Sequence, residues 1–396
     1  MGTGAPDAVE AARLVLRLRT AGDQDPVYAR LAELGPVHVM PWKAVVVSDH
    51  AVCRQVLLDG NCAALDAAWR DRITPGWRVS PSLVAFHSSL LTTNPPGHAR
   101  LRGSLTAGLS PRAVAAMGPS VSKAVERGVD DVVRALAHGG GAELVSALSE
   151  RLPGEILCAW AGLPGRDAPA LARLARRWSA ACELGPGPAQ LADADLAHAQ
   201  LRDYFTSRLR DRARTPGEDA LSRWLLPAPD GGGLGIAAAA TNAALLFLGA
   251  KDLAALTTTA LHALLTDAPL AGLLRRNPPA AASVAEDLAH RRPPIAVLTR
   301  VAARDMLLGG VRVPAGRIVH ALLRPAHRAV ADPGRTLAFG AGRHYCPGAP
   351  LTRLFLRTLL PLVASRFPAV RLDPAPPRSV GVVFPHLRSL PVTVDR

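Results

Sequence analysis

Lysine is almost absent from this chain of 396 residues, in which only Lys43, Lys123 and Lys251 occur. Arginine therefore carries nearly all of the formal net charge of +14. Aromatic residues are also few, at 4% of the chain, and they form no motif that could stack nucleic-acid bases. A basic chain can attract nucleic acid, but these arginines are scattered along the sequence. We therefore expect no nucleic-acid partner and interpret the charge as solvated, arginine-rich surface.

Cysteine pairs and long apolar runs are missing too. The five cysteines form no C-x-x-C pair, which favours reduced thiols in a cytoplasm over a secreted disulfide scaffold. The longest apolar stretch, 236–250, stops at Lys251-Asp252 and is too short for a membrane span. Residues 1–19 lack a basic region followed by an apolar core, so no signal peptide is evident. These features predict a cytoplasmic protein with no membrane partner.

Helical periodicity dominates what is present, and 49% of the residues are hydrophobic, enough for a large core. We expect residues 1–25 to be a polar lead-in, and Gly- and Pro-rich joints at 185–188 and 227–235. The pattern predicts a mainly α protein with small β-sheets. Its helices are expected at 98–138, 143–162, 167–182, 190–212, 236–266 and 349–366, and its strands at 44–47, 296–320 and 380–394.

The most informative segment is the decapeptide 339–348, which fits F-x-x-G-x-x-x-C-x-G with Phe339, Gly342, Cys346 and Gly348 on the fixed positions. Glycine lets the backbone bend sharply or pass close to a large flat group. Pro347 suits the first turn of a helix. Backbone N–H groups and the positive end of that helix favour a negative sulfur. The loop therefore suits a thiolate that binds iron.

This loop resembles the heme-binding signature of the cytochrome P-450 family, in its bacterial form with His344 before the cysteine. The resemblance extends over most of the chain, and it implies the cytochrome P-450 fold in one domain, residues 1–396. It also implies heme b with Cys346 as the ligand of the iron. The alternatives are a buried free thiol and a zinc site with His344, for which no second ligand pair has suitable spacing.

Heme propionates need cationic partners, because burying unpartnered carboxylates is unfavourable. His98 and Arg102 meet the H-x-x-x-R pattern that the family places under the heme edge, and a spacing of four puts them on one helix face. By the same resemblance, Arg300 and His344 are further propionate partners. The alternatives are surface positions for His98, Arg102 and Arg300, and a loop-packing role for His344.

The sequence departs from the family where the resemblance implies oxygen activation. There the family usually has an acid followed by a threonine after a glycine, but here Gly249 is followed by Ala250, Lys251 and Asp252. Lys251 takes the place of the acid and Asp252 that of the alcohol, while threonines 257–259 fit the register poorly. A carboxylate can relay protons, so both are candidate catalytic residues. Neighbours on a helix point about 100° apart and need not pair; the alternative is that both simply tolerate a partly wet groove.

Two further departures lie before the cysteine loop. The family's E-x-x-R helix is matched by Asp287 and His290, which cannot form a bidentate pair. Glu286 and Arg291 could substitute only through a shift. Ten residues separate Arg328 from Phe339, fewer than the family has there, and the arginine that usually locks onto the E-x-x-R pair is missing. These losses predict a looser loop, and hence weaker heme retention or a different donor interface.

The resemblance implies a heme-thiolate oxidoreductase of the monooxygenase type that acts on a small organic substrate, as a tailoring step in specialised, or secondary, metabolism. It also implies a ferredoxin-type electron donor with its reductase, for which the basic surface is suitable. Without the acid–alcohol pair, we expect coupling, cyclisation, desaturation or peroxide-driven chemistry instead of simple hydroxylation. The alternatives are a heme-binding helper or scaffolding protein for another enzyme, and a non-redox heme isomerase or dehydratase.

Overall fold

The computed structural model describes residues 5–138, 140–226, 233–372, 376–379 and 381–394. They fall into two compact units. The first unit holds the described residues of 1–66, 286–346 and 378–386, and the second holds those of 67–285, 347–377 and 387–396. The expectation of one domain over residues 1–396 stays a prediction. Part of the predicted joint at 227–235 lies outside the described residues.

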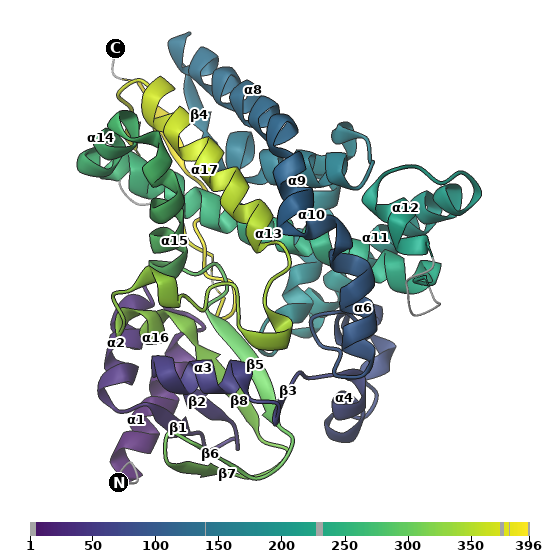
Figure 1. The fold of residues 1–396 in the computed structure, drawn as a ribbon. Helices are drawn as coiled ribbons and strands as arrows, with labels where there is room; N and C mark the ends of the chain where they lie inside the picture. The colour runs from purple at the N-terminus through teal and green to yellow at the C-terminus, as the bar shows by residue number, and fades with distance from the viewer. Residues whose placement is uncertain (1–4, 139, 227–232, 373–375, 380, 395–396) are drawn as a thin grey trace. The chain divides into compact units, whose positions relative to one another are not determined.

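The first unit is built on a five-stranded sheet with the strand order β1-β2-β8-β5-β3 (Figure 1). The strands β2 and β8 pair in parallel, and the other neighbours pair antiparallel. The predicted strand at 44–47 and the β segments at 296–320 are confirmed. The bounds are β1 Val37–Val39, β2 Val45–Val47, β3 Cys62–Ala63, β5 Val297–Ala302 and β8 Ile318–Leu322, with a separate hairpin of β6 Met306–Leu308 and β7 Val311–Val313.

Helix α3, His50–Leu58, packs on this sheet, and Val45 and Val47 of β2 share an apolar core with Val319 of β8. The polar lead-in predicted for residues 1–25 is wrong. Ala11, Leu14 and Leu18 recur at helical spacing, and all three are buried. The helices with residues in this unit are α1 Ala5–Arg17, α2 Asp25–Glu33, α3 His50–Leu58, α16 Leu323–Arg328 and the end of α15 Ala281–Arg291, with short turns η7 Pro333–Arg335 and η8 Gly342–His344.

The second unit is almost entirely helical. Its only sheet among the described residues has the order β4-β10-β9, from β4 Gly141–Glu143, β10 Pro391–Thr393 and β9 Arg371–Leu372. The helices are α4 Ala67–Ile73, α5 Pro81–His87, α6 Gly97–Thr106, α7 Pro111–Ala116, α8 Gly118–Ala137, α9 Arg151–Trp160, α10 Ala168–Trp178, α11 Pro188–Arg214, α12 Ala220–Leu225, α13 Ile236–Thr266, α14 Ala268–Arg276 and α17 Ala349–Arg366. Mainly α structure with small sheets is therefore confirmed.

The single helix predicted over 98–138 is divided into α6, α7 and α8. The side chain of Ser110 caps α7 by accepting a hydrogen bond from the Ala113 N–H, and Pro111 begins the new helix. Pro119 stands in the first turn of α8 in the same way. Proline lacks the N–H that continues a helix but suits its first turn. The helical periodicity of the apolar residues continues across these two prolines, and for that reason it predicted a single helix.

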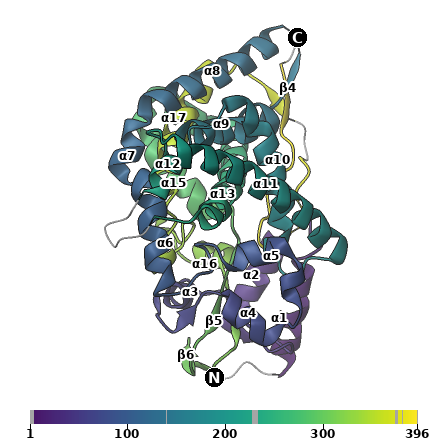
Figure 2. The ribbon, with the colours of Figure 1, turned by 90° about the vertical axis from the view of Figure 1, so that its right-hand side faces the viewer.

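Helix α13 has the predicted bounds and lies among α9, α10 and α11 (Figure 2). Among the described residues, it is the one helix whose length and apolar composition would suffice for a membrane span. However, 56% of its apolar window is buried inside the protein, as in the core helix of a globular fold. We therefore interpret α13 as a core helix that carries Lys251 and Asp252 near its middle.

Candidate functional site

The loop that contains Cys346 is closed by its own backbone. The Cys346 N–H donates to the Phe339 carbonyl at 2.8 Å, and the Tyr345 N–H donates to the Gly342 carbonyl at 3.1 Å. Cys346 is half-buried. Helix α17 begins three residues later, at Ala349, so the prediction that Pro347 stands in its first turn is wrong; Pro350 takes that position.

Two glycines give the loop its shape. Gly340 and Gly342 have φ angles of +72° and +66°, in the left-handed region that other residues avoid. A Cβ at Gly342 would lie 3.1 Å from the Leu57 carbonyl oxygen at the end of α3. Gly348, in contrast, has an ordinary φ of −81° as the N-cap of α17. The signature glycine at 342 is therefore required by the turn and by its close approach to α3.

Arg300 is the clearest electrostatic feature of the first unit. Its side chain lies on β5, and the residue is only 8% exposed. Among the described residues its guanidinium bonds only to the Thr299 carbonyl, at 2.9 Å, and no carboxylate lies within ion-pair distance. Burial lowers the pKa of Arg300 to about 10, and the cationic Arg343 beside the cysteine lowers it further. A buried cation without an anion, next to a second cation, fits a negatively charged group such as a heme propionate.

The other predicted cationic residues lie on two elements. His98 and Arg102 both lie on α6, as expected from their spacing, with His98 buried and Arg102 half-buried. His344 is the last residue of η8 in the cysteine loop and is half-buried. His344, Arg300 and Cys346 belong to the first unit, and His98 and Arg102 belong to the second. Their roles toward heme stay predictions.

Lys251 and Asp252 form an ion pair in the middle of α13. The Lys251 Nζ lies 3.1 Å from Asp252 Oδ1, and the two side chains are only 9% and 19% exposed. Adjacent helix residues were expected to have no need to pair, but in this low-dielectric environment a lone charge would be unfavourable. Burial raises the pKa of Asp252, whereas Lys251 lowers it. The two candidate catalytic residues are thus one coupled unit.

The nearby threonines do not replace the missing alcohol. The hydroxyls of Thr257, Thr258 and Thr259 each donate to the carbonyl four residues earlier, at 2.7, 2.9 and 3.0 Å. A hydroxyl held by its own helix in this way has its proton committed to the backbone. This agrees with their poor register in the sequence.

Asp287 and His290 do not form the pair that the E-x-x-R comparison suggests. Asp287 instead binds Arg291 at 2.8 Å, and the Arg291 side chain is 71% exposed. His290 is buried, and its Nε2 donates to the Val330 carbonyl at 2.7 Å. The acid and the base of the weakened motif therefore do different things, one at the surface and one in the core.

Sequence reasoning missed residues that only the folded chain brings together. Cys182 of η5 (Ser179–Cys182) is close enough for Lys251 and Asp252 to influence it, and burial raises its pKa. Arg343 stands between two signature positions of the loop, and only its electrostatic effect on Arg300 gives it significance. His327 directly precedes Arg328 and lies outside every motif of the sequence. No sequence pattern marks any of these three.

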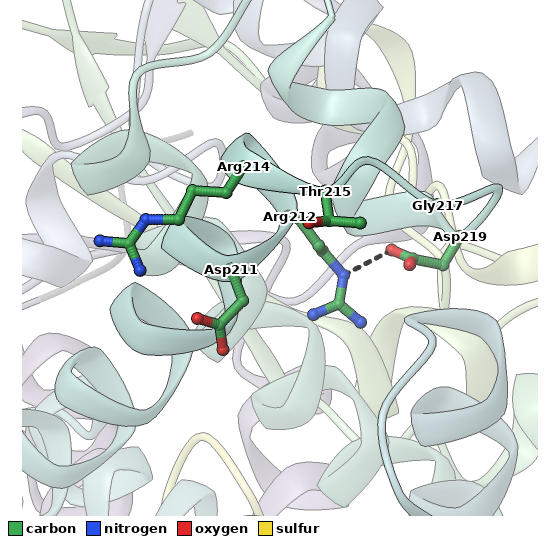
Figure 3. A pocket seen from close by; sticks show the side chains of 6 residues that line it. All are labelled: Asp211, Arg212, Arg214, Thr215, Gly217 and Asp219. Atoms are coloured by element: carbon green, nitrogen blue, oxygen red, sulfur yellow. Dashed lines mark hydrogen bonds and ion pairs between the residues drawn. The ribbon is translucent and has the colours of Figure 1, made fainter.

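One cavity, of about 390 Å³, lies at the end of α11 and is lined by Asp211, Arg212, Arg214, Thr215, Gly217 and Asp219 (Figure 3). Arg212 binds Asp219 Oδ1 at 2.8 Å and also donates to the carbonyls of Ala161 and Gly162. Its hydrogen-bonding groups are therefore used to join α9, α11 and α12. This cavity surrounds a structural junction, and it contains none of the predicted site residues.

A second cavity, of about 620 Å³, lies along α8 and α9. Its two central arginines, Arg127 and Arg151, both bind Glu155, at 2.5 and 2.8 Å. The charges at its centre are therefore largely compensated within the protein. No predicted site residue lines it either.

Comparison with known proteins supplies the relatives. No family model matches the chain. It is 30% identical over 397 residues to the cytochrome P450 monooxygenase PikC of Streptomyces venezuelae, covering 93% of this chain and 90% of that protein. It is also 30% identical over 366 residues to the nocardicin C N-oxygenase of Nocardia uniformis, covering 88% and 89%.

Solved structures agree with these relatives. The cytochrome P450 enzyme CxnD, described as forming a C–S bond in chuangxinmycin biosynthesis, matches with a TM-score of 0.80 and 26% identity, covering 93% of this chain and 94% of CxnD. The match therefore extends over nearly the whole chain in sequence and in fold. Together with the cysteine loop, it shows that this chain belongs to the cytochrome P450 family of heme b monooxygenases, oxidoreductases that act on paired donors with incorporation of oxygen.

Proposed function

We propose that this cytochrome P450 carries out a tailoring oxidation of a small organic substrate in secondary metabolism, with proton handling that differs from simple hydroxylation. The observation that carries the proposal is the buried Lys251–Asp252 ion pair on α13, in place of an acid and an alcohol. Two relatives by name support the metabolic setting: one is a nocardicin C N-oxygenase, and CxnD forms a C–S bond.

We assign the heme to the residues that the signature and the buried charges indicate. Cys346 would bind the iron, and Phe339, Gly342 and Gly348 would shape the loop around it. Arg300, His344, His98 and Arg102 would hold the propionates. When bound, a thiolate-ligated heme supplies oxygen activation, because the thiolate donates electron density to the iron. The unpaired burial of Arg300 is the feature of the apoprotein that most favours this assignment.

Lys251 and Asp252 would control protons at the substrate side. A buried carboxyl with a raised pKa holds a proton more readily than a surface carboxylate does, so Asp252 can accept and release one nearer neutral pH. The Lys251 ammonium opposes that rise and can donate a hydrogen bond of its own. This pair is suited to proton transfer to or from a substrate group, which coupling and cyclisation reactions require.

The electron donor belongs to the proposal as well. A formal net charge of +14 favours association with an acidic protein, and a ferredoxin-type donor with its reductase is the class we expect. Because such steering is electrostatic, raising the salt concentration should lower the rate of reduction. A neutral donor would show no such dependence.

The spectrum of the heme-loaded protein tests the ligand. We expect a strongly red-shifted Soret band when the reduced protein is exposed to carbon monoxide, and its loss in Cys346→Ser. Cys62→Ser, which removes another buried thiol of the same unit, serves as the control and should keep the band. An unchanged band in Cys346→Ser would contradict the assignment. A protein that binds no heme at all would favour the helper role.

Turnover tests the proton pair. Compounds that shift the Soret band on binding would be offered to the protein with a ferredoxin, its reductase and NADPH. We expect Asp252→Asn to lower the rate of product formation about 10²-fold or more, in the range typical of lost acid–base catalysis. The control is Asp267→Asn, which alters the carboxylate that directly follows α13 and caps α14. Equal turnover by Asp252→Asn and the parent would contradict the role of Asp252.

A further inference from the structure

Three buried histidines surround residues 330–337, the segment that leads into the cysteine loop. His50 begins α3, His290 lies near the end of α15 and His327 lies near the end of α16. Each is only 2% exposed. The His290 and His327 rings are stacked, with centroids 4.3 Å apart and planes at 22°, and the His50 ring is 6.3 Å from that of His327. All three belong to the first unit.

Each ring makes one hydrogen bond to this segment. His290 Nε2 lies 2.7 Å from the Val330 carbonyl, and His50 Nε2 lies 2.9 Å from the Arg335 carbonyl. The Leu337 N–H donates to His327 Nε2 at 2.9 Å. Residues 330–337 have no helix or strand hydrogen bonds apart from the single turn η7. A different histidine therefore holds the beginning, the middle and the end of this segment.

The contacts of His327 fix its protonation. Its Nε2 accepts a hydrogen bond and so carries no proton, while its Nδ1 lies 2.6 Å from the His290 carbonyl and must carry one. His327 is therefore neutral, with the proton on Nδ1. An imidazolium could not accept the Leu337 N–H.

A short chain of backbone hydrogen bonds continues from His327 to the cysteine. The Leu337 carbonyl accepts from the Gly340 N–H at 2.8 Å, and the Phe339 carbonyl accepts from the Cys346 N–H at 2.8 Å. Leu337 itself is buried in the core of the unit, at 3% exposed. The position of the Cys346 loop is thus linked to the ring of His327 through these hydrogen bonds.

No ion pair takes part in this arrangement among the described residues. Asp287, the acid of the weakened motif, is engaged by the exposed Arg291. The looser loop expected from the weakened Glu–Arg pattern stays a prediction, and the described segment is hydrogen-bonded at its beginning, middle and end.

We propose that His327 is a positioning residue for the Cys346 loop. Together with the stacked His290 and the hydrogen bond from His50 to the Arg335 carbonyl, His327 forms a neutral, hydrogen-bonded lock in place of a charged one. The inference rests on the proposed function only in taking Cys346 as the iron ligand. The lock itself is a property of the protein chain and can be measured without heme.

Two substitutions separate the two bonds of His327. In His327→Gln the side-chain oxygen reaches the position of Nε2 and can still accept from the Leu337 N–H. In His327→Asn the amide reaches only the position of Nδ1, so it keeps the bond to His290 and loses the one to Leu337. His38→Asn alters another buried histidine of the same unit, whose Nε2 bonds to the Leu31 carbonyl, and is the matched control.

Hydrogen exchange at the Leu337 and Gly340 amides is the measurement, made on both the heme-free and the heme-loaded chain. We expect His327→Asn to lower protection of these amides about tenfold or more, because a buried N–H loses its acceptor. His327→Gln should rescue protection to within about threefold of the parent, and His38→Asn should leave it unchanged. In the loaded protein, His327→Asn should also lose its red-shifted carbon monoxide band faster than His327→Gln.

Equal protection in His327→Asn and the parent would overturn the proposal, as would failure of His327→Gln to rescue. If His327→Asn does not fold, His290→Phe tests the same lock, because it keeps the stacked ring and removes the bond to Val330. Lower protection across residues 330–337 is then expected, and parental protection would contradict the lock. If Cys346 is not the iron ligand, the parent itself lacks the red-shifted band while the exchange result is unaffected.

Discussion

Arg300 is a cation that the protein buries without giving it an anion among the described residues. Such a residue is unfavourable in the free chain, because desolvation of a charge is not compensated by one hydrogen bond to a carbonyl. The lowered pKa, about 10, has this cause. A buried cation without an anion therefore marks a site where an anionic ligand is expected. It should destabilise the heme-free protein and stabilise the complex with heme.

We predict that Arg300→Met stabilises the heme-free protein by about 1–3 kcal/mol and weakens heme retention. The free energy of unfolding would be measured in urea, and heme transfer to an excess of a heme-scavenging globin would measure retention. Arg304→Met removes an exposed arginine just beyond the same strand and should change neither quantity. A destabilised heme-free Arg300→Met with unchanged retention would show that Arg300 serves the apoprotein alone.

A second prediction concerns the contribution of the Lys251–Asp252 ion pair to stability. Lys251→Met should destabilise the fold by about 2–4 kcal/mol, because it leaves the Asp252 carboxylate buried without its cation. It should also raise the pKa of Asp252, since Lys251 holds that pKa down. Lys251→Met/Asp252→Leu, with neither charge, should recover most of the lost stability. Additive losses in the double variant, measured by urea unfolding, would show that the two charges are not coupled.

At the scale of elements, α9, α11 and α12 are joined at the cavity of Figure 3. Asp219 caps α12 by accepting from the Ser222 N–H and also binds Arg212 of α11, which in turn bonds the carbonyls at the end of α9. Gly162 follows α9 with a φ of +66°, and a Cβ there would lie 2.6 Å from the Asp219 side chain. The junction therefore requires glycine for both conformation and space.

Gly162→Ala should consequently destabilise the protein by about 2–4 kcal/mol, from the left-handed backbone and the displaced Asp219. Thermal unfolding followed by circular dichroism would measure it. Gly165→Ala, three residues later, is the control: its φ is not in the left-handed region and a Cβ there would have no neighbour within 4 Å. Similar melting temperatures for Gly162→Ala and Gly165→Ala would contradict the requirement for glycine at position 162.

Buried histidines make the stability of the protein depend on pH, and His327 and His198 are two of them. Burial lowers the pKa of His327 to about 3 and that of His198, on α11, to about 4. Unfolded histidine has a pKa of about 6.5. Between that value and the lowered ones, the unfolded chain binds protons that the folded chain does not, so stability falls as the pH falls. Above about pH 7.5 both states are neutral and neither residue contributes to the dependence.

We predict that each histidine lowers the free energy of unfolding by about 2 kcal/mol between pH 7.5 and pH 5. His327→Gln and His198→Gln should each reduce the pH dependence of the parent by that amount, and the double variant by about 4 kcal/mol. Urea unfolding at both pH values would give the difference. The exposed His138 provides the control, since His138→Gln should leave the dependence unchanged. If the free energy of unfolding of the double variant fell between the two pH values by as much as that of the parent, burial of His327 and His198 as neutral rings would be contradicted.

The features that depend on residues near one another in the chain could be predicted from the amino-acid sequence. The cysteine loop, the α13 and α17 helices and the H-x-x-x-R face of α6 all follow from local spacing, and the bounds of α13 and α17 were predicted correctly. Local periodicity also accounts for the errors, because it does not register the prolines that divide 98–138. Nor did it draw attention to Ala11, Leu14 and Leu18 in a segment that looks polar on average.

The folded chain was needed to show which charges have partners and which segment the histidines hold. Whether Arg300 meets a carboxylate, and whether His327 accepts from Leu337 while stacking on His290, depends on contacts between separate elements. Hydrogen bonds and desolvation act over a few ångströms in space, whatever the separation along the chain. For that reason the loss of the Glu–Arg pattern was readable in the sequence, whereas the neutral lock we propose in its place was not.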